Sequence, residues 1–334
     1  MSLSENQCNT VFLNHFHTKE STYHERLRDF TAVNHHGSPA KIAEELDEGQ
    51  KAAIVVTEHF STNGEDWYKE LGRDIERDGG NYTLNENSLN LEQGGSEVTV
   101  WNGVEASYKD NQNHIIAAGL PINDEEDYLN LNSDDMEWLA DRSDYIHPAH
   151  PYFMDFGMEE DIIEDVIDIG QDSEAQLFLP ETHAYGVLDS MATGEVGSDT
   201  SVYDLSREED IPLIPEQDHH VHLPHNLSGV GLIPGGDSDE ITDRVEEVQV
   251  IEPENSIQSI LEEAIDTKNA VRTFADMLPG YNQEDGGVWK HVPDLGPFSI
   301  PVTDEDFEDI RDSSYRAALD FDISELQSRS RPLN

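Results

Sequence analysis

Apolar and β-branched residues form two short runs near the start of the chain, and each run leads directly into histidine. The runs cover residues 10–13 and 52–57; His15 and His17 follow the first, and His59 follows the second. Runs of this length and composition are typical of buried β-strands. The sequence therefore predicts two strands whose carboxyl ends carry polar side chains.

A helix is predicted between these two strands, and another after them. Ser38 and Pro39 supply an N-cap and a first-turn proline, Ile42 and Leu46 lie four residues apart, and a glycine ends the pattern. In the second helix, apolar residues are again spaced by four over residues 67–75, and two glycines follow. The order of strand, helix, strand and helix indicates a βαβ unit.

Alternation of strand and helix continues along most of the chain. Further strands are predicted at residues 97–101, 114–119, 143–147, 176–179 and 211–214, and further helices at residues 135–140, 160–169 and 256–266. Such alternation indicates a parallel sheet, either closed into a barrel or open and doubly wound. In both architectures the chemistry lies at the carboxyl ends of the strands.

The alternating pattern weakens after residue 274. The following sequence is rich in glycine and proline, and it contains one helical stretch at residues 305–319 and a polar tail. The sequence therefore predicts a main domain over residues 1–274 and an acidic C-terminal extension of unknown role over residues 275–334.

The chain is strongly acidic. It has 72 Asp and Glu residues against 19 Lys and Arg residues, a formal net charge of -53, and the acidic residues are spread along the whole sequence. In dilute buffer such a surface repels itself, whereas salt at about 1 M shortens the Debye length to roughly 3 Å. We therefore expect a protein of a very salty cytoplasm, made either by a halophilic host or by a virus that infects one.

Composition also excludes several classes of protein. A strong nucleic-acid surface needs clustered Lys and Arg, which are missing here, and 36% apolar residues argue against a disordered chain. The single cysteine, Cys8, excludes an intramolecular disulfide and a thiolate metal cluster. Because no long apolar run or signal peptide is present, we expect no membrane association and a cytoplasmic location.

Two pairs of polar residues have the spacing of metal ligands. His15 and His17 are two residues apart, so on a strand both imidazoles project to one face and can reach one ion. Asp218 and His220 repeat this spacing shortly after the predicted strand at residues 211–214. A single such pair is more often solvated than ligating, and it is the number and order of the pairs that favour chelation.

Six short motifs occur in one order along the chain. They are His15-Phe16-His17-Thr18, Thr57-Glu58-His59, Gly103-Val104-Glu105, His114-Ile115-Ile116-Ala117, Ala149-His150-Pro151 and Asp218-His219-His220. In content and order they resemble the motifs of the PHP (polymerase and histidinol phosphatase) family of metal-dependent phosphoesterases. The chain departs from the family pattern at Leu13 and Glu58, where the family usually has Asp.

The resemblance implies a fold and a ligand set. The fold would be of the α/β class, a distorted (β/α)7 TIM-like barrel of the PHP type with a C-terminal extension. The site would bind two to three divalent metal ions, and an imidazole-rich shell suits Zn, Mn or Fe better than Mg or Ca. The implied metal ligands are His15, His17, His24, His59, Glu105, His114, His150, Asp218 and His220.

The resemblance also divides these ligands among the ions. Glu105 would bridge an ion held by His15, His17 and Asp218 to a second ion held by His114 and His150. A third ion would take His59, His220 and one residue soon after the first motif. His24 is the first choice there, ahead of Glu25 and Glu20. His150 is preferred to His147 because it alone has the Ala-His-Pro context.

The implied activity is hydrolysis by a metal-activated hydroxide of a small phosphomonoester or phosphodiester that is histidinol phosphate-, nucleotide- or oligonucleotide-like. Glu105 and Asp218 would be central, and the leaving oxygen would take its proton from a metal-bound water or from a nearby imidazole, for which His225 is the candidate. No nucleophile elbow, phosphate-binding P-loop or H-E-x-x-H helix competes with this hypothesis. Lys19, Arg26 and Arg28 are candidates for phosphate recognition.

Two alternatives stay open at this point. The fold could have been recruited as a structural or binding component of a larger assembly, including a viral one, although a complete ligand set argues against an idle site. Metal-dependent hydrolysis of a non-phosphate bond would call for a carbamylated lysine, and no suitable Lys lies among the motifs. The sequence leaves the oligomeric state undetermined.

Overall fold

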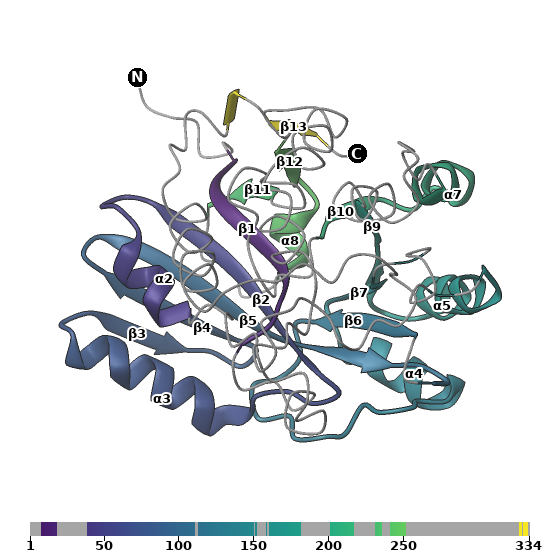
Figure 1. Cartoon of the computed structure of the whole chain (residues 1–334), viewed down its shortest axis with the longest axis horizontal. Helices are drawn as coiled ribbons and strands as arrows, with labels where there is room; N and C mark the ends of the chain where they lie inside the picture. Colours follow the sequence, from purple (N-terminus) through teal and green to yellow (C-terminus); the bar gives the residue numbers. More distant parts are fainter. Residues whose placement is uncertain are drawn as a thin grey trace, which may run out of the picture.

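The computed structural model describes residues 8–18, 39–110, 113–149, 151, 158, 160–181, 201–216, 231–235, 241–251, 327–328 and 330–332. A mixed sheet dominates the fold, and three parallel strands lie at its centre (Figure 1). They are β1 (Cys8–Phe16), β2 (Lys51–His59) and β5 (Ser96–Ser107). Because the three strands run in one direction, their carboxyl ends lie together.

β5 is the longest of these strands, and the sheet divides along it. One edge of β5 pairs with β2. The other edge pairs first with β4 (Ser88–Gln93) and then with β6 (His114–Ala118), both antiparallel. β3 (Asn81–Leu84) forms a hairpin with β4. The sheet therefore forks halfway along β5, and the carboxyl half of this strand lies in the branch that contains β6.

The remaining strands extend the sheet at both ends. Beyond β6 follow β7 (Tyr145–Pro148) and β8 (Gln176–Leu177), and beyond β1 follow β11 (Gly231–Pro234), β12 (Gln249–Ile251) and β13 (Ser330–Pro332). A separate parallel pair consists of β9 (Leu179–Glu181) and β10 (Leu213–Pro215). β13 pairs with β12, so residues 330–332 join the main sheet.

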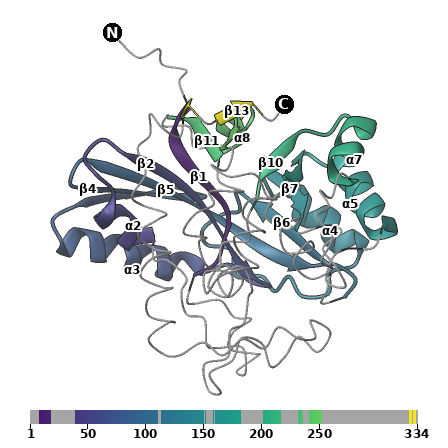
Figure 2. The same ribbon diagram turned by 45° about the horizontal axis from the view of Figure 1, so that its top comes forward.

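Helices cover the outer face of the sheet in two groups (Figure 2). α2 (Pro39–Glu45) and α3 (Gly64–Arg77) pack on the branch with β4. α4 (Ser133–Ala140), α5 (Glu160–Asp172) and α7 (Ser201–Glu209) pack on the branch with β6. The short helix α8 (Thr242–Val245) packs with Trp101 of β5 in a third core, on the inner face.

Both faces of the central strands are buried, which explains their continuous apolar runs. In β2, Ile54 and Val56 face the outer core, whereas Ala53 and Val55 face the inner core. α3 follows β2 and buries Tyr68, Leu71 and Ile75 at helical spacing. Full burial of one such aliphatic side chain stabilises the fold by about 1.5–3 kcal/mol.

The expected (β/α)7 barrel is wrong. The chain forms a curled mixed sheet resembling a half-barrel, with few helices and several antiparallel pairs. β5 extends to Ser107, so only residues 108–113 connect it to β6. A parallel neighbour needs a crossover of about a dozen residues or more, and this short link therefore makes β6 antiparallel. β11 returns antiparallel to β1 and excludes closure by a parallel strand at that edge.

Most predicted elements are confirmed, with shifted ends. The hairpin of β3 and β4 was not predicted, nor were β11, α7 and β13. The helices predicted at residues 256–266 and 305–319 lie outside the described residues. Among the described helices, none is both long enough and apolar enough to cross a membrane.

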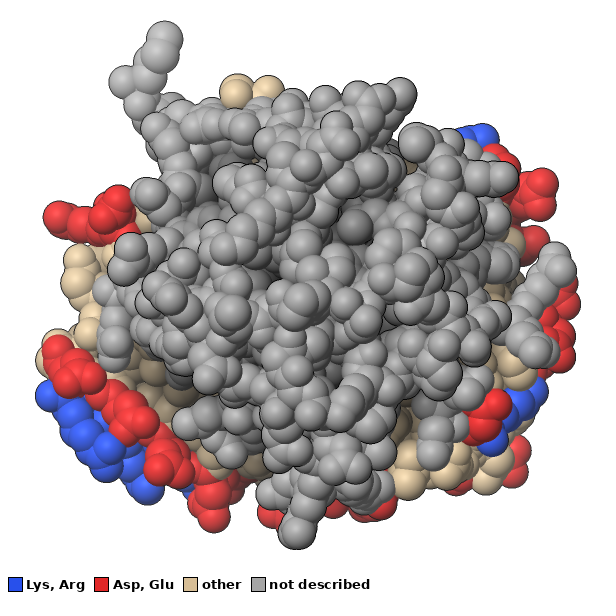
Figure 3. All heavy atoms as spheres, in the orientation of Figure 1, with Lys and Arg blue, Asp and Glu red and all other residues tan. Residues whose placement is uncertain are grey.

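On the face shown in Figure 3, Asp and Glu side chains gather where described residues are visible at the margin. Lys and Arg side chains form a smaller group over α3. In α3, Lys69, Arg73 and Arg77 follow one another at intervals of four residues. Lys69 pairs with Glu65 at 2.7 Å and Arg77 pairs with Asp74, so acidic neighbours partly neutralise this basic stripe.

Candidate metal centre

Polar side chains replace apolar ones on the inner face where the central strands end. In β2 the inner positions continue from Val55 to Thr57 and His59, and in β5 they continue from Trp101 to Glu105. His59 is the register partner of Glu105 on the neighbouring strand. Alternation along two paired strands therefore places this imidazole and this carboxylate side by side.

β1 reaches the same place through a β-bulge. Leu13 pairs with Ile54 but Phe16 pairs with Val56, so β1 has one more residue than β2 over this stretch. His15 has φ = 59°, the left-handed conformation found in some bulges. The extra residue returns Phe16 to the outer core beside Leu13 and turns His17 inward.

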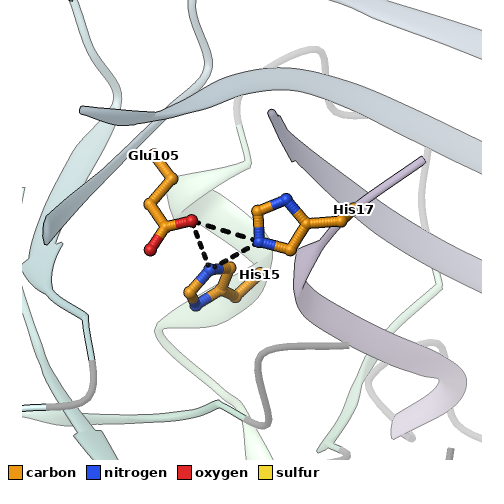
Figure 4. Close-up of side chains that lie close together, drawn as sticks. All are labelled: His15, His17 and Glu105. Carbon is orange, nitrogen blue, oxygen red and sulfur yellow. Dashed lines mark hydrogen bonds and ion pairs between the residues drawn. The ribbon is translucent and has the colours of Figure 1, made fainter. Parts of the chain in front are cut away.

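Four imidazoles surround the carboxylate of Glu105. Glu105 Oε2 lies 3.4 Å from His15 Nε2, 3.2 Å from His17 Nε2 and 2.6 Å from His59 Nδ1. Glu105 Oε1 lies 2.5 Å from His114 Nδ1. Figure 4 shows His15 and His17 each directing a ring nitrogen toward the same oxygen of Glu105. His15, His17, His59 and Glu105 are buried, and the side chain of His114 is 12% exposed.

These five side chains form two groups that could each hold a metal ion. One group is His15, His17 and Glu105, and the other is His59, His114 and Glu105. Glu105 belongs to both, one oxygen facing His114 and the other the remaining imidazoles. The carboxylate is thus placed to bridge two neighbouring cations.

The donor spacing in the first group fits a divalent ion. His15 Nε2 and His17 Nε2 are 3.1 Å apart, and they lie 3.4 and 3.2 Å from the same oxygen of Glu105. Bonds of about 2.0–2.1 Å in a tetrahedral shell place the ligand atoms roughly 3.3 Å from one another. Nitrogen and carboxylate donors of this kind suit Zn, Mn or Fe.

No family model matches the chain, and no curated protein matches it either. The assignment of this centre therefore rests on its side chains.

Electrostatics favours the protonation states that bind cations. Burial alone would raise the pKa of Glu105, but His59, His114 and His15 outweigh it and hold that pKa well below its usual range. Burial lowers the pKa of His59 well below its usual value, although nearby Glu105 acts in the opposite direction. Both directions favour the forms that a metal ion requires, the ionised carboxylate of Glu105 and the neutral imidazole of His59.

A second layer of buried polar residues surrounds the centre. Glu216, which directly follows β10, contacts His15 Nδ1 and is fully buried. Asn14 Nδ2 donates to His147 Nε2 at 3.0 Å, and Tyr145 donates from its hydroxyl to Asn14 Oδ1 at 2.6 Å. These contacts join β7 to the bulge in β1.

Glu58 anchors the chain as it leaves β1. Its Oε1 accepts hydrogen bonds from the backbone N–H and the hydroxyl of Thr18 and, at 3.3 Å, from Asn63 Nδ2. Burial raises the pKa of Glu58, although His17 and these donors lower it in part. Glu58 thus fixes the exit of the strand that carries His15 and His17.

The structure brings together five of the predicted site residues, namely His15, His17, His59, Glu105 and His114. We expected His59 to hold a separate third ion, whereas its ligand atom groups with those of Glu105 and His114. The remaining candidates, His24, His150, Asp218, His220 and His225, lie outside the described residues, as do Glu20 and Glu25.

Sequence reasoning missed the second layer. His147 was considered only as a competitor of His150, and its own position in β7 was not used. Glu216 gave a usable signal, because it stands two residues after the strand predicted at residues 211–214 and two residues before Asp218. Asn14 and Tyr145 gave no such signal, since their contact joins strands 131 residues apart in sequence.

Proposed function

We propose that this protein is a metal-dependent phosphoesterase of the PHP kind that hydrolyses a small phosphomonoester or phosphodiester. The observation that carries the proposal is the convergence of four imidazoles on the buried carboxylate of Glu105. The five residues come from four motifs whose content and order resemble those of the family. The proposal concerns the chemistry of the site and not a closed barrel.

The residues of the centre would divide the work between them. Glu105 would be shared by the two groups of imidazoles, and its ionised state would balance part of the charge of two cations. His15 and His17 would hold one ion, and His59 and His114 the other. Burial of these donors excludes water and strengthens every electrostatic interaction inside the site.

Bound divalent ions would supply a water of lowered pKa and positive charge for the phosphate oxygens. In this proposal the ions, rather than Lys or Arg side chains, balance the charge of the phosphate. Several of the described cationic side chains already pair with carboxylates. Lys51 lies 2.6 Å from Glu97, and Arg142 lies 2.6 Å from Asp124. Asp218 and His225 keep their proposed roles as a ligand and as the proton donor to the leaving oxygen.

The test is metal analysis of protein purified in molar KCl, followed by a panel of phosphomonoesters and phosphodiesters assayed in the same salt. We expect about two or more divalent ions per chain and turnover of at least one ester that chelation abolishes and Mn or Zn restores. Less than one ion per chain, together with no turnover after Mn or Zn is added, would overturn the proposal. Bound ions without turnover would instead favour a structural or binding role.

A further inference from the structure

Glu216 is a second carboxylate beside the centre, and it is placed differently from Glu105. It is fully buried, as is the imidazole of His15, and its Oε1 contacts His15 Nδ1. The other ring nitrogen of His15, Nε2, faces His17 and Glu105. His15 therefore lies between two carboxylates, one on each side of its ring.

The proton on His15 is assigned by this geometry. A carboxylate oxygen accepts hydrogen bonds, so the contact with Glu216 places the proton of a neutral His15 on Nδ1. Nε2 is then left with its lone pair directed toward His17 and Glu105. The tautomer held by Glu216 is the one that can donate an electron pair to a cation in the first group.

A second imidazole, that of His147, lies near Glu216 but beyond hydrogen-bond distance. His147 Nε2 accepts from Asn14 Nδ2, so the proton of His147 is on Nδ1, which lies 3.0 Å from the carbonyl oxygen of Pro148. The same Nδ1 lies 3.7 Å from Glu216 Oε2. Each oxygen of Glu216 thus faces a different imidazole.

The cost of burying the carboxylate of Glu216 indicates that this residue has a role beyond packing. Burial of a carboxylate is unfavourable unless its partners compensate for the lost water. Leu or Gln of similar volume would avoid that cost if the position served packing alone. A cation bound at His15 Nε2 would polarise the ring, make Nδ1–H a stronger donor and strengthen the hydrogen bond to Glu216.

We infer that Glu216 is a positioning residue of the metal centre, which acts through His15 by fixing the tautomer and the ring orientation that present Nε2 to the ion. The inference rests on the metal-binding part of the proposed function and not on the identity of the substrate. Glu216 contacts the edge of the His15 ring that points away from Glu105. It therefore holds the ring of His15 in place without facing the proposed ion position.

The test compares zinc binding by the full chain and by two variants, Glu216→Gln and Glu216→Leu, in molar KCl by competition with a chelator. Glu216→Leu removes the acceptor at similar volume, and we expect zinc affinity to fall by about 10- to 100-fold. Glu216→Gln keeps an acceptor oxygen, and its affinity should lie between those of wild type and Glu216→Leu. Glu97→Gln, a surface change on β5, is the control and should bind as wild type does.

A second readout separates positioning from packing and from direct ligation. In the ¹⁵N spectrum of the zinc-loaded protein, His15 should be bound through Nε2 and protonated on Nδ1, with the Nδ1–H signal shifted in Glu216→Gln. The His15 resonances are assigned from a His15→Gln variant. Circular dichroism confirms that each variant folds.

Three outcomes would overturn the inference. Unchanged zinc affinity in Glu216→Leu would show that the carboxylate is not needed. A lower number of bound ions with an unchanged His15 spectrum would show that Glu216 is itself a ligand. A wild-type chain that binds no divalent ion would overturn the metal centre and this inference together, whereas the first two outcomes leave the proposed function standing.

Discussion

Glu105 is the residue on which both candidate ion positions depend. It is 1% exposed, and its two oxygens face different imidazoles. Removal of one carboxylate oxygen should therefore affect both positions, whereas loss of a single histidine should affect one. This asymmetry distinguishes a bridged pair of ions from two independent sites.

Glu105→Gln should bind fewer ions than the wild-type chain and should lose the second ion altogether. An amide is neutral and cannot offset the repulsion between two close cations. Equilibrium dialysis with Mn or Zn in molar KCl measures the stoichiometry. Glu97→Gln on the same strand is the control and should keep the wild-type number, and unchanged stoichiometry in Glu105→Gln would refute a bridging role.

Cys8, the first residue of β1, offers a test of the fold at the level of one residue. Burial, and then the charge of Glu247, raise the pKa of its thiol from 9.0 to about 11. The folded thiol therefore keeps its proton when the unfolded thiol begins to lose it. The contribution of Cys8 to the free energy of unfolding is therefore fully present below pH 9 and should decline as the pH rises toward 11.

At pH 9 and in molar KCl, iodoacetamide should alkylate Cys8 slowly in the folded chain and rapidly in the chain unfolded by urea. About half of the unfolded thiols are ionised at that pH, against roughly one in a hundred folded ones. Mass spectrometry over time gives both rates. Equal rates in the two states would contradict the burial of Cys8 at the start of β1.

At the scale of elements, the bulge in β1 decides the geometry of the site. The spacing of His15 and His17 indicated correctly that the two imidazoles meet, but simple alternation would have sent both toward the outer core with Leu13. The left-handed conformation of His15 corrects this direction. The sequence did not predict the bulge, because position 15 is neither Gly nor Asn, the residues that favour a left-handed conformation.

The bulge predicts an unusual order of stability at position 15. In metal-free protein, His15→Gly should be more stable than His15→Ala by about 1 kcal/mol, because Ala pays the cost of a left-handed backbone. Both variants lose the same imidazole contacts, so the difference reports on the backbone alone. Urea unfolding in molar KCl with a chelator measures it, and the reverse order would argue against the bulge.

The strands and the first helices could be predicted from the sequence, whereas their pairing could not. Apolar runs located β1, β2 and β6, and spacing by four located α3. The barrel prediction was wrong because the strand predicted at residues 97–101 ended too early. The connection before β6 therefore seemed long enough for a crossover. The five site residues were found through the content and order of their motifs. They lie together because β1, β2 and β5 are parallel neighbours and because His114 opens the strand that pairs with the end of β5.

At the scale of the whole molecule, the net charge of -53 should make stability depend on salt. Raising KCl from about 0.1 M to about 1 M shortens the Debye length from about 10 Å to about 3 Å and screens the repulsion between acidic side chains. The melting temperature should rise steeply over this range. Sucrose matched for osmolality is the control, and a melting temperature independent of KCl would contradict the halophilic interpretation.

The central claim is that Glu105 joins two metal positions, and anomalous diffraction from crystals grown with Zn or Mn tests it most directly. We expect one anomalous peak among His15, His17 and Glu105 and another among His59, His114 and Glu105. The absence of any peak at Glu105, with zinc or manganese in the crystal, would contradict the claim.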